Sequence, residues 1–297
     1  MIGVQYARPR NVEAATALLA SLGPGASIIA GGQELMPELN YNVFVPSVLV
    51  DINGLKELKG IEPGEDALSI GALCAHRDIE RDPHVNRHAP LLAHAVAQIG
   101  GGWQVRNRGT IGGNIVSMHP LYDTIPALLA MDASLRIARD GAVRDLGVGE
   151  LLRSTDHGLG SEAILTRIIV PHASRNANWG YYKLKNTHGA YASATAAALV
   201  ELDESGCLTD IRVVVGSVEA LPRDISAALA PLHGAPADRD MLLRVEDIAR
   251  GCVREPISDQ RGDGAYRTAM AGVCARRAVE RAIALSKQPE HQAMGGL

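Results

Sequence analysis

Two short segments combine a glycine pair with apolar and polar neighbours, a composition that suits binding of a phosphate group. The first is Ile28-Ile29-Ala30-Gly31-Gly32-Gln33-Glu34-Leu35, and the second is Thr110-Ile111-Gly112-Gly113-Asn114. Glycine adopts positive φ angles and lets another group approach the backbone closely. Successive N–H groups in such a turn can converge on an anion such as a diphosphate. We therefore predict two turns, each at or near an apolar strand, that hold one diphosphate from two sides.

Spacing alone leaves an ordinary pair of turns open, because the chain has 31 glycines. The segments are not a Rossmann fingerprint, since no G-x-G-x-x-G stands between a strand and a helix. Gly23-Pro24-Gly25 precedes an expected strand rather than following it. The sequence also lacks G-x-x-x-x-G-K-[ST], G-x-S-x-G and H-E-x-x-H, so a P-loop, a serine hydrolase and a zincin have no motif support.

Composition narrows the class of protein further. The 297 residues suffice for two or three modest domains, and 46% of them are hydrophobic. The formal net charge is -4 with no basic stripe, which argues against nucleic acid as a partner. The start has no apolar signal segment, and no apolar run is long enough for a bilayer, so we expect a cytoplasmic protein.

The four cysteines are widely separated. None of Cys74, Cys207, Cys252 and Cys274 belongs to a C-x-x-C pair, so the sequence indicates neither a zinc site nor an iron–sulfur cluster. Small buried hydrophobic residues in a reducing compartment are the simpler interpretation.

Start and stop signals predict a small βαβ unit first. Asn11 suits the N-cap of a helix over 12–22 that ends at Gly23, and strands are expected at 26–30 and 47–52. A hairpin over 58–73 turns at Pro63-Gly64-Glu65-Asp66. Further elements are helices at 90–99 and 123–131 and strands at 133–138 and 164–170. A polar stretch at 174–178 indicates a domain boundary.

Beyond that stretch, the pattern predicts three antiparallel strands and two amphipathic helices. The strands are expected at 180–185, 192–201 and 210–218, and the helices at 238–253 and 264–285. The polar tail 288–297 is expected to be loose.

The ordered set of segments resembles the FAD-binding (medium) subunit of the xanthine dehydrogenase and carbon monoxide dehydrogenase molybdenum hydroxylase family. The resemblance covers nearly the whole chain, and the second glycine segment with its flanks is its most specific part. The matching segments are Ala30–Pro37, Arg106–Asn114, Pro120–Ala133, Ile164–Pro171, Tyr182–Lys185 and Val213–Pro222.

This resemblance implies an α+β chain with a two-lobed FAD-binding fold of the PCMH or vanillyl-alcohol-oxidase-like type. The N-terminal lobe would span 1–55, the central lobe 56–175, and a C-terminal domain with a three-stranded sheet and helical bundle 176–287, before the tail 288–297. FAD would be bound non-covalently between the lobes. The implied partners are a small [2Fe-2S] subunit and a large molybdopterin subunit, in a dimer of heterotrimers.

The resemblance also assigns site residues. Ile28, Ile29, Ala30, Gly31, Gly32, Gln33, Glu34 and Leu35 would contact the diphosphate and ribityl region, together with Thr110, Ile111, Gly112, Gly113 and Asn114. Gly100 matches another FAD contact, and Asp123 matches a hydrogen-bond acceptor. Leu165 and Lys183 match positions near the isoalloxazine, with Tyr191 beside the ring. Taken without the family, Leu165 is a core residue, Lys183 a solvated charge and Asp123 a helix N-cap.

The chain departs from the family pattern at two places. Met118-His119 stand where Ala-Asp is common, and Glu34 replaces a commoner Asp or Ser. These departures bear on which branch of the family this is and on how acceptors approach the flavin. His119 and Asp123 are too few ligands for a metal site, and the sequence predicts none.

Two other functions remain open from the sequence. A free-standing FAD oxidoreductase, such as the UDP-N-acetylenolpyruvoylglucosamine reductases, would need a proton donor in a substrate pocket, and no acid–base constellation stands out. A scaffold that has lost FAD would have no need of the bare backbone at Gly31, Gly32, Gly112 and Gly113. The favoured function is an electron-transfer flavoprotein subunit without catalytic residues for the organic substrate. This chain determines neither which organic substrate the complex oxidises nor which acceptor takes the electrons.

Overall fold

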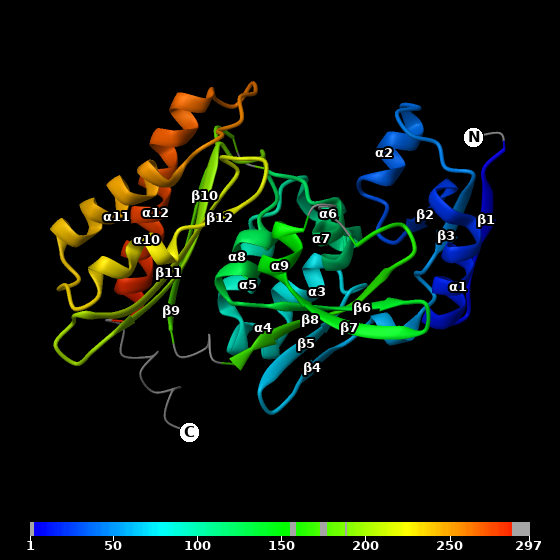
Figure 1. The fold of residues 1–297 in the computed structure, drawn as a ribbon, viewed down its shortest axis with the longest axis horizontal. Coiled ribbons are helices and arrows are strands. Elements are labelled where there is room, and N and C mark those ends of the chain that lie inside the picture. The colour runs from blue at the N-terminus through cyan, green and yellow to red at the C-terminus, as the bar shows by residue number, and fades with distance from the viewer. Residues whose placement is uncertain (1–2, 155–158, 173–176, 188, 287–297) are drawn as a thin grey trace.

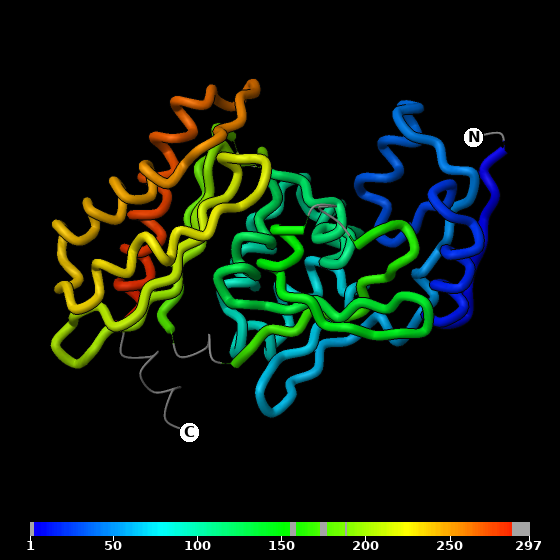
Figure 2. The backbone as a smooth tube through the Cα atoms, viewed as in Figure 1, coloured from blue at the N-terminus to red at the C-terminus, as the bar shows by residue number. Residues whose placement is uncertain are grey.

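The computed structural model describes residues 3–154, 159–172, 177–187 and 189–286. Three sheets follow one another along the molecule, each belonging to one part of the chain (Figure 1). The N-terminal segment forms one end and the C-terminal helices form the other, as the tube in Figure 2 shows. The predicted boundary at 174–178 falls largely outside the described residues, and the predicted tail 288–297 falls wholly outside them.

The N-terminal lobe is the predicted βαβ unit, and its strands are parallel. The sheet has the order β1-β3-β2, with β1 at Gln5–Ala7, β3 at Val48–Asp51 and β2 at Ala26–Ile29. Helix α1 spans Val12–Leu22, and the Asn11 side chain accepts a hydrogen bond from the N–H of Ala14, which confirms the predicted cap. The glycine segment then leads into the short helix α2 at Leu35–Asn40.

The central lobe contains a five-stranded antiparallel sheet of order β4-β5-β8-β6-β7. Its strands are β4 Ile61–Pro63, β5 Ala67–Gly71, β6 Ser134–Arg139, β7 Ala142–Gly147 and β8 Ile164–Pro171. The hairpin at Pro63-Gly64 is confirmed, but its first strand begins later than predicted because 56–58 form a 3-10 turn.

Seven short helices cover this sheet, and the sequence predicted two of them. They are α3 His76–Arg81, α4 Pro83–His88, α5 Pro90–Ala97, α6 Gly102–Arg108, α7 Ile111–Ser117, α8 Thr124–Ala130 and α9 Val148–Arg153. Helices this short are unstable alone and depend on burial, so they leave little periodic signal. The second glycine pair lies in the first turn of α7, so its predicted place in a turn by a strand was wrong.

The C-terminal domain pairs an antiparallel sheet with two long helices. The strands are β9 Asn178–Leu184, β10 Ala194–Leu202, β11 Leu208–Gly216 and the two-residue β12 Arg223–Asp224, which adds a fourth strand to the three predicted. Helices α10 Ser226–Leu229, α11 Arg239–Cys252 and α12 Gly264–Ser286 follow. Figure 1 shows α11 and α12 on one face of this sheet and the central lobe toward the other.

Burial of both faces explains the unbroken apolar composition of β10. Ala197 and Leu199 belong to the core shared with the central lobe, whereas Ala196, Ala198 and Val200 belong to the core under α11 and α12. Successive strand residues point to opposite faces, so both sets must be apolar.

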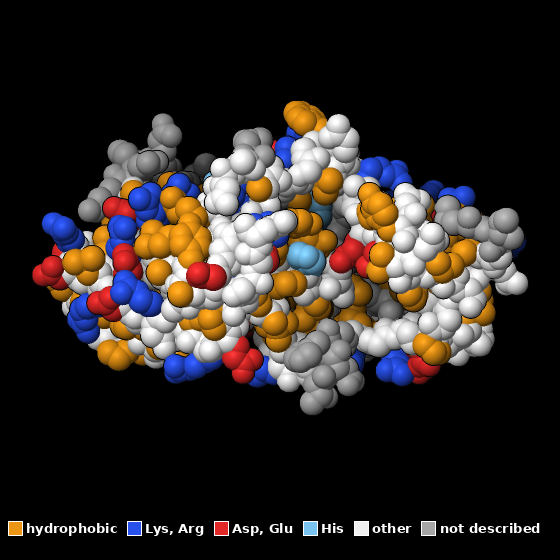
Figure 3. Space-filling model, turned by 90° about the horizontal axis from the view of Figure 1, so that it is seen from above, with side chains coloured by type: hydrophobic (Ala, Val, Ile, Leu, Met, Phe, Trp, Pro, Cys, Tyr) orange, Lys and Arg blue, Asp and Glu red, His pale blue; other side chains and the backbone are white. Residues whose placement is uncertain are grey.

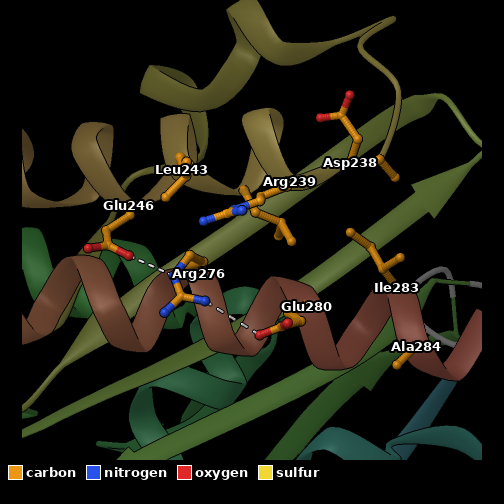
Figure 4. A pocket seen from close by; sticks show the side chains of 10 residues that line it. Asp238, Arg239, Leu243, Glu246, Arg276, Glu280, Ile283 and Ala284 are labelled. Carbon is orange, nitrogen blue, oxygen red and sulfur yellow. Dashed lines mark hydrogen bonds and ion pairs between the residues drawn. The ribbon is translucent and has the colours of Figure 1, made fainter.

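Helices α11 and α12 are joined at the surface by charged side chains. Arg276 of α12 lies 2.6 Å from Glu246 of α11 and 3.6 Å from Glu280 one turn further along α12 (Figure 4). These groups border a hollow of about 650 Å³ lined by α11, α12 and the residues just before α11. Within the described residues, no helix has both the length and the hydropathy of a bilayer span.

Close approach of α12 to β9 provides a stability test. A Cβ at Gly180 would stand 1.8 Å from the carbonyl oxygen of Ala278, so Gly180→Ala must push the helix away from the sheet. We expect a loss of about 1–3 kcal/mol in the free energy of unfolding, measured by urea denaturation. Gly251→Ala is the matched control, because nothing lies within 4 Å of its Cβ position, and it should not destabilise the protein. Equal stability of the two variants would contradict this packing.

Candidate functional site

A cavity of about 880 Å³ lies where the N-terminal lobe, the central lobe and one loop of the C-terminal domain meet. Its volume falls within the range of about 300–1,000 Å³ typical of cofactor and ligand sites. Most of the predicted site residues line it: Ile28, Ala30, Gly31, Gly32, Gln33, Glu34, Leu35, Gly100, Thr110, Gly112, Gly113, Asn114, Asp123, Leu165 and Tyr191. In the view from above, acidic and histidine side chains lie over this middle part of the molecule (Figure 3).

Three predicted residues do not line the cavity. Ile29 is a β2 residue paired with Asp51, and Ile111 is a fully buried residue of the central core. Lys183 lies behind the wall, where it contacts Asp123. The alternation of strand and helix side chains turns one residue of each glycine segment away from the cavity.

The first glycine segment carries a run of unpaired hydrogen-bond donors. Within the described part of the chain, no acceptor bonds the backbone N–H groups of residues 31–35, all of which line the cavity. Gly32 has φ +69°, a conformation that favours glycine. Asn53 fixes the start of the segment by donating to the Ala30 carbonyl at 2.9 Å and to Asp51 at 2.7 Å. The segment therefore offers a run of free N–H donors of the kind that binds an anion.

The second glycine segment uses its N–H groups within the protein. Ile111 donates to the Cys74 carbonyl at 3.0 Å, Gly112 to the Ala72 carbonyl at 2.9 Å, and Gly113 to the Thr110 hydroxyl at 3.2 Å. The expected nest of N–H groups is therefore absent from these residues of α7. The segment still contributes polar side chains to the cavity, because Asn114 accepts a hydrogen bond from Thr124 through Oδ1 and keeps its amide NH2 as a donor.

Several of the predicted glycines are required by contacts within the protein. A Cβ at Gly31 would stand 2.1 Å from the Arg108 carbonyl oxygen, and one at Gly112 would stand 2.8 Å from the Ala72 carbonyl oxygen. A Cβ at Gly100 would stand 2.2 Å from the carbonyl oxygen of Gly189. A scaffold that has lost FAD would therefore also need these glycines. Their presence does not argue against such a scaffold, contrary to the expectation from the sequence.

Asp123 is the centre of a buried network between the central lobe and β9. Its carboxylate lies 2.7 Å from Lys183 Nζ and accepts from the Tyr181 hydroxyl at 2.6 Å. The side chains of Asp123 and Lys183 are only 4% and 2% exposed, and Lys183 also donates to the Gln98 carbonyl at 3.0 Å. Burial, and then the negative charge of Asp123, raises the pKa of Tyr181 well above its usual value.

Two simple interpretations of these residues are therefore wrong. Asp123 precedes α8 but makes no side-chain capping hydrogen bond, and Lys183 is not a solvated charge. Leu165 is 5% exposed and belongs to the central core, yet it also lines the cavity.

An aromatic cluster stands at the cavity beside this network. The His119 ring lies 4.8 Å from that of Tyr122 and 5.3 Å from that of Tyr191, centroid to centroid. The Arg261 guanidinium lies 5.3 Å from the centroid of the Tyr191 ring, and Glu34 lies 3.5 Å from the Tyr122 hydroxyl. His119 and Glu34 are both departures from the family pattern. His119 stacks on Tyr122 and Tyr191, and Glu34 accepts from the Tyr122 hydroxyl, so the two departures meet at the same tyrosine.

Burial favours the neutral forms of the His119, Tyr122 and Tyr191 rings. Burial lowers the pKa of His119, and burial followed by the negative charge of Glu34 raises the pKa values of Tyr122 and Tyr191.

Among the described residues, no group of three or more His, Cys, Asp or Glu side chains could hold a metal ion.

Sequence reasoning missed several polar residues of the cavity wall, among them His76 and Tyr122. The position of Tyr122 beside Asp123 was a usable signal. His76 gave none, because a single histidine after an apolar strand is typical of an ordinary core residue.

Comparison with known proteins supports the geometry. Residues 2–173 match the model described as the FAD binding domain in molybdopterin dehydrogenase, and residues 179–282 match the CO dehydrogenase flavoprotein C-terminal domain. The chain belongs to this family. It is 33% identical over 281 residues to the carbon monoxide dehydrogenase medium chain of Hydrogenophaga pseudoflava, covering 94% of this chain and 97% of that one. It is 30% identical to the 6-hydroxypseudooxynicotine dehydrogenase complex subunit alpha of Paenarthrobacter nicotinovorans, covering 94% of each.

Solved structures of family members have the same fold. The carbon monoxide dehydrogenase of Hydrogenophaga pseudoflava superposes with a TM-score of 0.89 at 32% identity, covering 96% of this chain and 99% of that one. Quinoline 2-oxidoreductase of Pseudomonas putida also gives a TM-score of 0.89, at 27% identity, with 96% and 98% covered. The predicted family and the predicted α+β, FAD-binding fold are confirmed. This chain is the flavoprotein component of a molybdopterin-dependent oxidoreductase.

The cavity fits the FAD that this domain implies. A diphosphate needs donors, and the unpaired N–H groups of 31–35 supply them. An elongated cofactor needs a long, mostly apolar channel, and the cavity runs from Pro24 in the N-terminal lobe to Tyr191 in the C-terminal domain.

The buried Asp123–Lys183 pair generates a stability prediction. Asp123→Ala leaves the Lys183 ammonium buried without its partner, so we expect a loss of about 3–5 kcal/mol in the free energy of unfolding. The double variant Asp123→Leu/Lys183→Met removes both charges and should regain most of that loss. Urea denaturation followed by circular dichroism measures both variants without added FAD. A double variant as unstable as Asp123→Ala would show that the ion pair is not the cause.

Proposed function

We propose that this chain holds FAD non-covalently and transfers electrons from the [2Fe-2S] clusters of a partner subunit to an external acceptor. The observation that carries the proposal is the row of unpaired N–H donors at 31–35 beside a cavity shared by three parts of the chain. Bound there, FAD accepts electrons singly and releases them in pairs, which suits a relay that follows one-electron carriers.

Each part of the cavity has a role in this proposal. The N–H groups of 31–35 hold the diphosphate, and Thr110 with Asn114 holds the ribityl chain from the opposite lobe. Gly100, Leu165 and Tyr191 surround the isoalloxazine. Asp123 accepts a hydrogen bond from the ring system, and Lys183 orients that carboxylate from behind.

The described residues offer no site for a metal centre within this chain. They contain no cluster of ligands for a metal ion, and Cys74 and Cys274 are buried as isolated free thiols. Burial raises the pKa of both thiols, that of Cys274 to about 12, which disfavours the thiolate form that binds metals. We propose that electrons reach the flavin from another chain.

The relatives' names support a multi-subunit complex. Several are medium chains or subunits of dehydrogenase complexes. We propose a small [2Fe-2S] subunit and a large molybdopterin subunit as partners, in a cytoplasmic dimer of heterotrimers. Permanent contacts of this kind bury on the order of 2,000 Å² or more. Within the chain we propose an N-terminal lobe at 1–55, a central lobe at 56–175 and a C-terminal domain at 176–287.

The mode of FAD binding has a direct test. Acid precipitation of the yellow protein should release all of the flavin into the supernatant as FAD, identified by chromatography, because we propose that hydrogen bonds from residues 31–35 hold it. Flavin that remains in the protein pellet would contradict non-covalent binding. A colourless protein that takes up no added FAD would contradict the proposed function.

The relay role is tested by comparing the chain alone with its native complex. Purified under native conditions from its source, the chain should co-purify with an iron–sulfur subunit and a molybdopterin subunit. Alone, with FAD bound, it should not oxidise the organic substrate of that complex, while dithionite should still reduce its flavin. Substrate oxidation by the free, FAD-loaded monomer would favour the free-standing oxidoreductase instead.

A further inference from the structure

His76 is the first residue of α3 and forms part of the cavity wall in the central lobe. The residue is 2% exposed, and its backbone N–H donates to the Gly109 carbonyl at 3.0 Å. The ring lies against Gly109, where a Cβ would stand 3.0 Å from Cδ2 and 3.2 Å from Nε2 of His76. On the other side, a Cβ at Gly31 would stand 3.0 Å from the Gly109 Cα. A single glycine therefore separates the imidazole from the first glycine segment.

The imidazole is neutral near pH 7. Burial, followed by the positive charge of Arg106, lowers the pKa of His76 to about 4. A neutral ring carries one N–H and one lone pair. Nδ1 is buried and has no hydrogen-bond partner among the described residues. A buried N–H without an acceptor is costly, so we assign the proton to Nε2 and leave Nδ1 with the lone pair.

The guanidinium of Arg106 does not provide another donor at this point. Besides burial, the positive charge of Arg106 lowers the pKa of His76. The Arg106 guanidinium forms an ion pair with Glu80 at 3.4 Å and donates a hydrogen bond to the Ile99 carbonyl at 3.1 Å. The N–H groups at the start of α7 also have acceptors within the protein. His76 is thus an uncommitted polar group that the central lobe presents beside residues 31–35.

We propose that the Nε2–H of His76 donates a hydrogen bond to a phosphate oxygen of the FAD diphosphate. The N–H groups of 31–35 then bind the diphosphate from the N-terminal lobe, while His76 binds it from the central lobe. This assignment rests on the proposed function, because it presupposes FAD in the cavity. It restores a two-sided grip on the diphosphate, with a side chain in the role that the second glycine segment does not fill.

Two substitutions at His76 separate the donor from the shape of the ring. His76→Phe keeps an aromatic ring and removes the donor, so the dissociation constant for FAD should rise about 10- to 100-fold in titrations of the apoprotein. His76→Gln keeps an N–H group at the end of a side chain of similar reach, and its affinity should stay within about threefold of the wild type. Riboflavin lacks phosphate, so its affinity should be the same in the wild type and in His76→Phe.

A stability measurement excludes a purely structural role. In the absence of FAD, His76→Phe replaces an unpartnered buried nitrogen with carbon, so the thermal midpoint of the apoprotein should be unchanged or higher. The ¹⁵N spectrum of the wild-type apoprotein should show the Nε2–H tautomer of His76. The ³¹P resonances of bound FAD should move in His76→Phe.

Each contrary outcome has a distinct meaning. Unchanged FAD affinity in His76→Phe, equal losses for FAD and riboflavin, or a parallel loss of apoprotein stability would overturn the role of His76. If the wild-type chain binds no FAD at all, the proposed function fails first.

Discussion

The buried carboxylate of Asp123 holds the central lobe and the C-terminal domain in one arrangement. It accepts hydrogen bonds from Tyr181 and Lys183 of β9, and Lys183 also reaches the Gln98 carbonyl after α5. A buried ion pair adds little net stability, but it is costly to break, so it specifies geometry. Once β9 is fixed in this way, the loop that follows it is delivered to the cavity.

A second buried charge fixes the far end of that loop. Arg267 of α12 is fully buried and donates to the carbonyls of Ser193, at 2.8 Å, and Ser217. It also pairs with Asp259 at 2.6 Å. The loop bearing Tyr191 is therefore tied to β9 at one end and to α12 at the other. A cofactor site in the first two parts of the chain thus depends on side chains of the third.

The sequence could predict what local chemistry determines. The Asn11 cap, the Gly23 stop and the apolar runs in β10 and β11 are short-range signals, and the elements they predicted are present. The short central-lobe helices could not be predicted in the same way, because their stability comes from a core assembled from distant segments. Resemblance to the family predicted which residues line the cavity. It did not predict what each of them contacts, because those contacts join segments that are far apart in the sequence.

The glycines show why those roles were hard to infer. A glycine that admits a ligand and a glycine that admits another backbone look the same in sequence, since both lack a Cβ. Here Gly31, Gly100 and Gly112 each face a carbonyl oxygen of another segment. Likewise, Lys183 has the residue type of a solvated charge, and only its contact with Asp123 reveals a positioning role.

Close backbone contact and unpaired donors are two consequences of the same joint. Because Gly31 touches the backbone of Arg108 and Gly109, the two lobes meet without intervening side chains. The turn that follows at Gly32 has a positive φ, and its N–H groups are left without acceptors in the described structure. Residues 31–35 are only partly buried, so these N–H groups are open to solvent and free to bind an anion. The joint between the lobes therefore presents free donors to a ligand with negative charge, and a diphosphate that contacts both lobes would accept hydrogen bonds from them.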